Sequence, residues 1–159
     1  MHRTFGFLAA LGLLAAGLAT LVSSPAQAVR AADPPATTGE AAPVESDMHE
    51  FMEYVFEPTY LRLKPKLAAE TADNAAFKAI KSDSLILAEA GNLLLIRQPD
   101  EDQADWAKHS IGVRDAGGEL YRAAKAKNFP ASKQHFAAMI QHCNACHDQF
   151  AGGEHQLNP

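Results

Sequence analysis

Three features are missing from this 159-residue chain, and each absence removes a class of protein. No basic stretch is present, so nucleic-acid binding is not expected. No strand pattern precedes the only two cysteines, Cys143 and Cys146, so they do not resemble a thioredoxin-like pair beside a βαβ unit. Nothing marks a substrate pocket or an acid–base pair, and the sequence therefore does not predict an enzyme.

The N-terminus has the layout of a secretory signal peptide. His2 and Arg3 precede an apolar run over residues 5–22, and the small-x-small site Ala26-Gln27-Ala28 follows it. We expect cleavage after Ala28, export to the periplasm and no membrane attachment afterwards. The alternative is an uncleaved anchor, since the apolar run is just long enough to span a bilayer.

Positive charge is in short supply. The chain has 14 Lys and Arg against 19 Asp and Glu, and loss of residues 1–28 removes only Arg3, which leaves 13 against 19 and a net charge of −6. Such a surface promotes solubility and favours a basic docking partner. Residues 29–46 are rich in Ala, Pro and Thr and have little to bury, so they predict a disordered linker before a domain at 47–159.

The two cysteines belong to the run Cys143-Asn144-Ala145-Cys146-His147, the C-x-x-C-H pattern of covalent haem attachment. Two thiols add across the two vinyl groups of haem b, and the histidine supplies the proximal nitrogen to the iron. On a helix, positions i, i+3 and i+4 project from one face. The sequence therefore predicts one covalent haem c with His147 as proximal ligand. In bacteria this attachment happens outside the cytoplasmic membrane, which agrees with export.

Two other uses of the cysteines fit the pattern less well. A structural zinc site would need a third and a fourth ligand at metal-finger spacing, which His135 and His142 do not provide. A disulfide between residues i and i+3 of one helix is also a poor fit.

Apolar residues recur at helical spacing from Asp47 to the Gly152-Gly153 pair. The first predicted helix spans residues 47–69, begins at an Asp47–Glu50 capping box and is kinked or split near Glu57 by Pro58. The second ends at Pro99, the third begins at an Asp100–Gln103 capping box, and the fourth follows Asn128. Four helices joined by short turns predict an all-α, antiparallel up-down-up-down four-helix bundle with covalent haem.

In such a bundle the start of the first helix lies level with His147. Met52 is the leading candidate for the distal iron ligand, with Met48 or His49 as alternatives, and the remaining alternative is an open or water-bound site. The same geometry places two further residues near the haem. Arg97 could pair with a propionate or be a solvated surface charge, and Trp106 could pack on the macrocycle or be ordinary core.

From Asp47 to about Phe150 the chain resembles the class II c-type cytochromes, the cytochrome c′ group. In that family a Met or apolar residue early in the first helix faces the iron. Phe150 stands where the family usually has an aromatic, whereas Ala151 replaces a frequent basic residue. Residues 48–54 and 150–155 are also similar to small exported cytochromes of planctomycete-type bacteria. Many bundles of this type form homodimers through their first two helices, and the sequence does not decide whether this chain does so.

The function predicted first is electron transfer with a redox partner protein of unknown identity. A Met–His pair raises the reduction potential of the iron, which suits an electron carrier. The alternative, implied by the resemblance, is a five-coordinate iron that binds nitric oxide or carbon monoxide. A third, weaker hypothesis is a small domain that docks on a larger periplasmic oxidoreductase.

Overall fold

The computed structural model describes residues 39 and 41–159, which belong almost entirely to one compact unit, Glu40–Pro159. The predicted signal peptide at 1–28 and most of the predicted linker at 29–46 lie outside the described residues. The described part is helical and contains no strand, which confirms the all-α class. Its elements are α1 (Met48–Phe51), the π-helix η1 (Met52–Phe56), α2 (Glu57–Ala68), α3 (Asn74–Leu94), α4 (Gln103–Lys125) and α5 (Phe129–Phe150).

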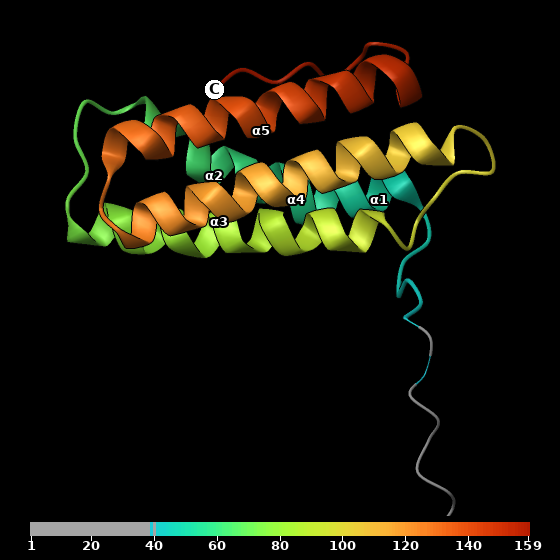
Figure 1. Ribbon diagram of the computed structural model, residues 1–159, viewed down its shortest axis with the longest axis horizontal. Helices are drawn as coiled ribbons and strands as arrows, with labels where there is room; N and C mark the ends of the chain where they lie inside the picture. Colours follow the sequence, from blue (N-terminus) through green and yellow to red (C-terminus); the bar gives the residue numbers. More distant parts are fainter. Residues whose placement is uncertain (1–38, 40) are drawn as a thin grey trace, which may run out of the picture. The chain divides into compact units, whose positions relative to one another are not determined.

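The elements α1, η1 and α2 follow one another without a break and together form one helical segment. This segment and the helices α3, α4 and α5 pack against one another as four helical segments (Figure 1). The contacts between α3 and α4 and between α4 and α5 are the most extensive. Close approach of α3 and α4 depends on glycine: a Cβ on Gly91 would lie 2.8 Å from the backbone nitrogen of Arg114. None of the helices between residues 41 and 159 is both long and apolar enough to span a bilayer.

The predicted interruption near Glu57 takes the form of a π-turn. The N–H of Glu57 bonds to the carbonyl of Met52, five residues earlier, and Pro58 follows at the start of α2. Proline has no N–H to continue the ladder of i to i−4 bonds. The π-turn closes with the N–H of Glu57, one residue before the proline that lacks an N–H, and the chain continues as a helix through Pro58.

One predicted helix start is confirmed and another is wrong. Asp47 caps α1 by accepting a hydrogen bond of 3.0 Å from the amide of Glu50. Asp100, by contrast, does not cap α4, which begins three residues later at Gln103. The residue before it, Asp102, has a left-handed backbone (φ 55°) and makes no side-chain cap, while the Gln103 side chain bonds to the carbonyl of Pro99 at 3.1 Å. Residues 100–102, which the capping pattern assigned to the start of the third helix, belong instead to the connection between α3 and α4.

The interior is divided into two apolar clusters. The main core joins α2, α3, α4 and α5 along most of their length and includes Leu63, Ile80, Leu120 and Phe136. A smaller group, here called the end cluster, consists of the buried residues Phe51, Ala90, Leu94, Trp106 and Cys146. It unites α1, the last turns of α3, the first turn of α4 and the last turns of α5.

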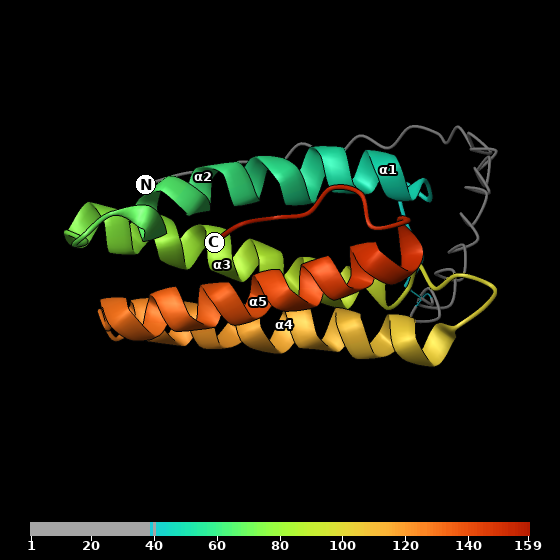
Figure 2. The same ribbon diagram turned by 90° about the horizontal axis from the view of Figure 1, so that it is seen from above.

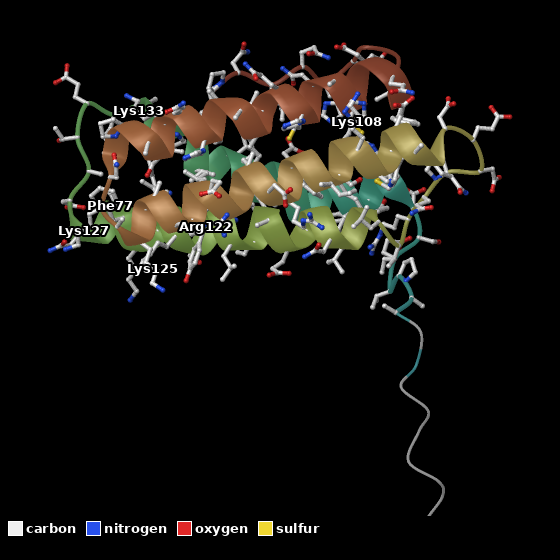
Figure 3. The ribbon with its side chains drawn as sticks, viewed as in Figure 1. Phe77, Lys108, Arg122, Lys125, Lys127 and Lys133 are labelled. Atoms are coloured by element: carbon white, nitrogen blue, oxygen red, sulfur yellow. The ribbon has the colours of Figure 1, made fainter. Side chains whose placement is uncertain are left out.

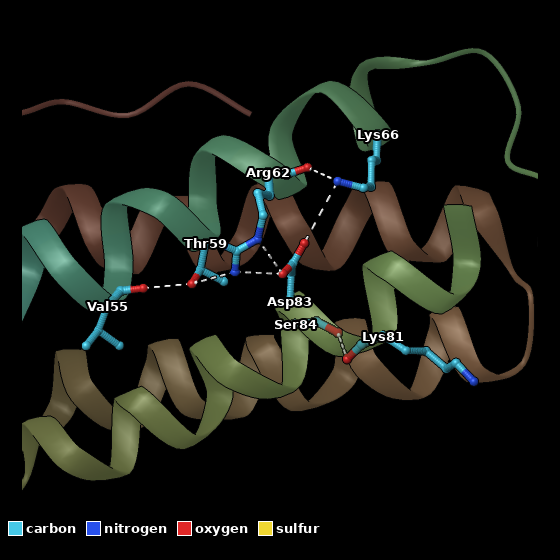
Figure 4. A network of polar contacts seen from close by, with 7 residues as sticks. All are labelled: Val55, Thr59, Arg62, Lys66, Lys81, Asp83 and Ser84. Carbon is cyan, nitrogen blue, oxygen red and sulfur yellow. Dashed lines mark hydrogen bonds and ion pairs between the residues drawn. The ribbon is translucent and has the colours of Figure 1, made fainter. Parts of the chain in front are cut away.

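A polar network ties α2 to α3 (Figure 4). Asp83, only 5% exposed, accepts hydrogen bonds from two nitrogens of Arg62, Nε at 3.0 Å and a terminal nitrogen at 2.9 Å. Lys66 lies 3.9 Å from the second carboxylate oxygen. The same terminal nitrogen of Arg62 also donates to the hydroxyl of Thr59, which in turn donates to the carbonyl of Val55. This buried carboxylate is therefore fully paired.

The chain after α5 reverses direction and returns along the bundle. Figure 2 shows this last segment running back between α2 and α5. It hydrogen-bonds to both helices, through Tyr60 on α2 and Asn144 on α5. Leu157 supplies its apolar contact with the main core.

Candidate functional site

The C-x-x-C-H motif occupies the last two turns of α5. Cys146 is 8% exposed and belongs to the end cluster, whereas Cys143 is partly buried against the main core. His147 is only partly buried. The motif therefore lies where the apolar interior meets the surface, with its sulfur atoms on the inner side.

Both cysteines are free thiols with raised pKa values. Burial raises the pKa of Cys143 to about 12, with a smaller contribution from the neighbouring Cys146, and burial raises the pKa of Cys146 to about 11. Dithiol redox catalysts instead have a cysteine whose pKa is lowered, commonly at a helix N-terminus. The position near the end of α5 and the raised pKa values argue against that chemistry here.

The His147 ring is held by the returning chain. Its Nδ1 lies 2.9 Å from the main-chain carbonyl oxygen of His155. A carbonyl only accepts, so this bond requires the proton on Nδ1 and leaves the lone pair of the neutral ring on Nε2. Histidines that bind metals commonly donate their other ring N–H to a carbonyl in this way. Nε2 is the atom that could bind an iron.

Two methionines and one histidine were predicted as distal candidates, and the structure separates them. Met48 and Met52 are both partly buried and pack against the end cluster that contains Cys146. His49 points outward, with 78% of its side chain exposed, and its Nε2 lies 3.6 Å from the carboxylate of Glu53. The two thioethers are therefore placed on the interior, and the imidazole is not.

Trp106 is part of the site's apolar wall. It is 5% exposed, donates from Nε1 to the carbonyl of Leu94 at 2.8 Å, and meets the Phe150 ring edge-on with a centroid distance of 5.1 Å. The hydrogen bond orients the indole, and the contact with Phe150 connects it to the turn of α5 that follows His147.

Arg97 covers the outer side of the end cluster. Its guanidinium carbon lies 3.9 Å from the centroid of the Phe51 ring, a cation–π contact. Its nitrogens donate to the carbonyls of Leu93 at 2.8 Å and Glu45 at 3.2 Å. The second of these bonds fastens the chain just before α1. Arg97 thus has structural partners in addition to its predicted nearness to the motif.

The motif faces a part of the bundle where the backbones are far apart. No Cα atom of α1 or η1 lies within 8 Å of a Cα atom of α5. Side chains of the end cluster bridge this distance, and they are apolar or aromatic. The two thiols and the imidazole with its Nε2 lone pair available are the groups that attach and ligate a covalently bound haem. The thioether of Met52 and the apolar wall suit a haem with a Met–His pair. The residues therefore fit the predicted cofactor.

One hollow on the described surface lies away from the motif. It has a volume of about 630 Å³ and is lined by residues of the opposite end, among them Phe77, Lys127 and Phe129. Figure 3 labels Phe77 and Lys127 at that end of the bundle. It contains no residue of the motif. In residues 41–159, moreover, no three His, Cys, Asp or Glu side chains are grouped to hold a metal ion, as a zinc site would require.

Two parts of this site were not predicted from the sequence. The carbonyl of His155 is a main-chain acceptor brought back by a turn, and only the Gly152-Gly153 pair hinted that the chain changes direction there. The π-turn begins at Met52 itself, and Pro58 was its only signal.

Comparison of the chain with protein-family models, with curated proteins and with solved structures found no match.

Proposed function

We propose that this protein is an exported monohaem c-type cytochrome that transfers electrons. Haem c would be attached through Cys143 and Cys146, with His147 as proximal ligand and Met52 as distal ligand. When bound, the group supplies a single site that exchanges one electron between the ferric and ferrous states. The proposal includes an up-down-up-down bundle of the class II type, cleavage after Ala28, and a partner protein that exchanges the electron.

The observation that carries the proposal is the state of the C-x-x-C-H motif. Its histidine is held as the tautomer that leaves Nε2 available for iron, and burial raises the pKa values of its thiols, the opposite of activation for disulfide exchange. The end cluster also brings Met52 to the apolar region that contains Cys146. These features support haem attachment and a Met–His pair more than a dithiol enzyme.

An absorption spectrum of the exported protein in both oxidation states tests the proposal. We expect covalent haem and a low-spin ferric spectrum with a methionine–iron charge-transfer band. Met52→Ala should abolish that band and leave the haem attached. Met48→Ala is the matched control, since its side chain contacts the same cluster, and it should retain the band.

Two results would contradict parts of the proposal. Loss of the band in Met48→Ala alone would move the distal ligand to that residue. A high-spin spectrum with rapid carbon monoxide binding to the ferrous protein would favour the alternative gas-binding function.

A further inference from the structure

The chain after α5 turns back at a glycine pair and is hydrogen-bonded to two helices, α2 and α5. We call residues Gly152–Pro159 the strap. Gly152 and Gly153 have φ values of +62° and +80°, a conformation that glycine adopts without steric cost. The amides of Ala151 and Gly153 both donate to the carbonyl of His147, at 2.9 and 3.0 Å. The reversal therefore starts at the proximal histidine itself.

Asn144 holds the strap from within the motif. Its side-chain nitrogen donates to the carbonyl of Leu157 at 2.9 Å, and its side-chain oxygen accepts from the amide of the same residue at 2.8 Å. This pair of bonds resembles one rung of a β-ladder, with a side-chain amide in place of a neighbouring strand. Asn144 directly follows Cys143, so the rung fixes the strap to the turn of α5 that carries the thiols.

Tyr60 holds the strap from the other helix. Its hydroxyl donates to the carbonyl of Asn158 at 2.7 Å and accepts from the amide of the same residue at 3.3 Å. The Tyr60 ring stacks on Phe136 of the main core, with a centroid distance of 6.3 Å, so the hydroxyl projects from a firmly packed group. The strap is thus fixed to both α2 and α5 on the carboxyl side of His155.

Between the glycine turn and these two contacts, His155 has little freedom. Its backbone is left-handed (φ 59°), and its carbonyl oxygen lies 2.9 Å from Nδ1 of the His147 ring. Gln156 adds a bond of 2.9 Å from its side-chain amide to Asp148. A carbonyl restrained on both sides can orient an imidazole ring more sharply than one on a loose tail.

We propose that Asn144 and Tyr60 are positioning residues for the proximal ligand. They hold the strap so that the His155 carbonyl fixes the ring plane and the Nδ1–H tautomer of His147. This inference rests on the proposed function, since it concerns the ligand of a bound haem. A hydrogen bond from Nδ1–H raises the basicity of the ligating nitrogen. Weakening the strap should therefore raise the reduction potential.

The experiment uses the haem-loaded protein and compares Asn144→Ala, Tyr60→Phe and the double variant with wild type. Asn158→Ala is the control, because the strap's bonds with Tyr60 use the main chain of residue 158. Two readouts are taken: exchange of the His147 Nδ1–H with solvent, followed by NMR in the reduced protein, and the midpoint potential. We expect at least about tenfold faster exchange and a higher potential in the double variant, and wild-type values in Asn158→Ala.

The outcomes separate the two proposals. Wild-type protein without covalent haem would overturn the proposed function and this inference with it. Haem-loaded double variant with wild-type exchange and potential would overturn the positioning role alone. Phenylalanine at position 60 keeps the ring that packs on Phe136, and circular dichroism of each variant verifies that the bundle is folded.

Discussion

At the scale of single residues, the environment of the cysteine pair determines its reactivity more than its spacing does. A C-x-x-C pair is shared by disulfide oxidoreductases, metal sites and haem proteins. Here the thiols of Cys143 and Cys146 are surrounded by apolar side chains, and their pKa values rise to about 12 and about 11. Such thiols stay protonated near neutral pH and are poor nucleophiles.

This burial predicts slow alkylation of the haem-free protein. Only the thiolate reacts, so at pH 8 a thiol of pKa about 11 should react roughly 100-fold more slowly than an ordinary thiol of pKa near 9. The rate should climb as the pH rises toward 11, since a raised pKa delays deprotonation. Iodoacetamide labelling followed by mass spectrometry measures it, with the urea-unfolded protein as control. Equal rates in folded and unfolded protein would contradict the burial.

At the scale of elements, the π-turn η1 sets where Met52 lies relative to α2. The turn contains one more residue than an α-turn and rotates every residue before it about the helix axis. It ends two residues before Pro58, which cannot donate to the carbonyl of Tyr54. We therefore expect Pro58 to set the orientation of the segment that carries Met52.

Replacing Pro58 by alanine should allow a regular α-helix and turn Met52 away from its present direction. We expect Pro58→Ala to weaken the methionine–iron band of the haem-loaded protein. Pro65→Ala is the matched control, because Pro65 lies inside α2 beyond the π-turn, and it should leave the band unchanged. A wild-type spectrum in Pro58→Ala would show that packing, not the proline, imposes the turn.

A second element-scale prediction concerns the tie between α2 and α3. Asp83→Asn removes the charge that pairs with Arg62 and Lys66 while keeping the size of the side chain. Because Arg62 is about half exposed, the loss should be roughly 1–3 kcal/mol of unfolding free energy, less than for a fully buried pair. Urea denaturation measures it. Glu119→Gln, which removes an exposed pair with Arg122, is the control and should leave the midpoint almost unchanged.

At the scale of the whole molecule, charge is divided between the two ends of the bundle. Carboxylates gather around the end cluster, in the segment before α1, in α1 and η1, in the connection to α4 and its first turn, and at or just after the end of α5. They are Glu45, Asp47, Glu50, Glu53, Asp100, Glu101, Asp102, Asp105, Asp148 and Glu154. At the other end, where Figure 3 labels Lys125, Lys127 and Lys133, basic side chains outnumber the carboxylates Glu70 and Asp73.

This separation predicts that electron exchange depends on the charge of the reagent. At low ionic strength a small cationic complex should react with the haem-loaded protein faster than an anionic complex of similar driving force, because the carboxylates surround the motif. The difference should shrink above about 0.1 M salt, where screening acts within about 10 Å. Stopped-flow measurement over a range of salt tests it. Equal rates for the two reagents at low salt would contradict it.

Much of the fold followed from local chemistry. The all-α class came from apolar spacing, and the start of α1 at Asp47 came from its capping side chain. The same kind of signal failed at Asp100, since a capping pattern states only that a helix could begin there. The path of the chain between Leu94 and Gln103 decided where α4 begins.

The sequence by itself determined the spacing of the motif and the helical face that carries it, because residue spacing and helix periodicity are local properties. Only the tertiary structure decided the rest: the carbonyl that holds His147, the cluster that receives Met52, and the partners of Arg97. A main-chain carbonyl has no signature in the sequence, and its position depends on a turn and on contacts with two other helices. Those contacts arise only when distant segments pack.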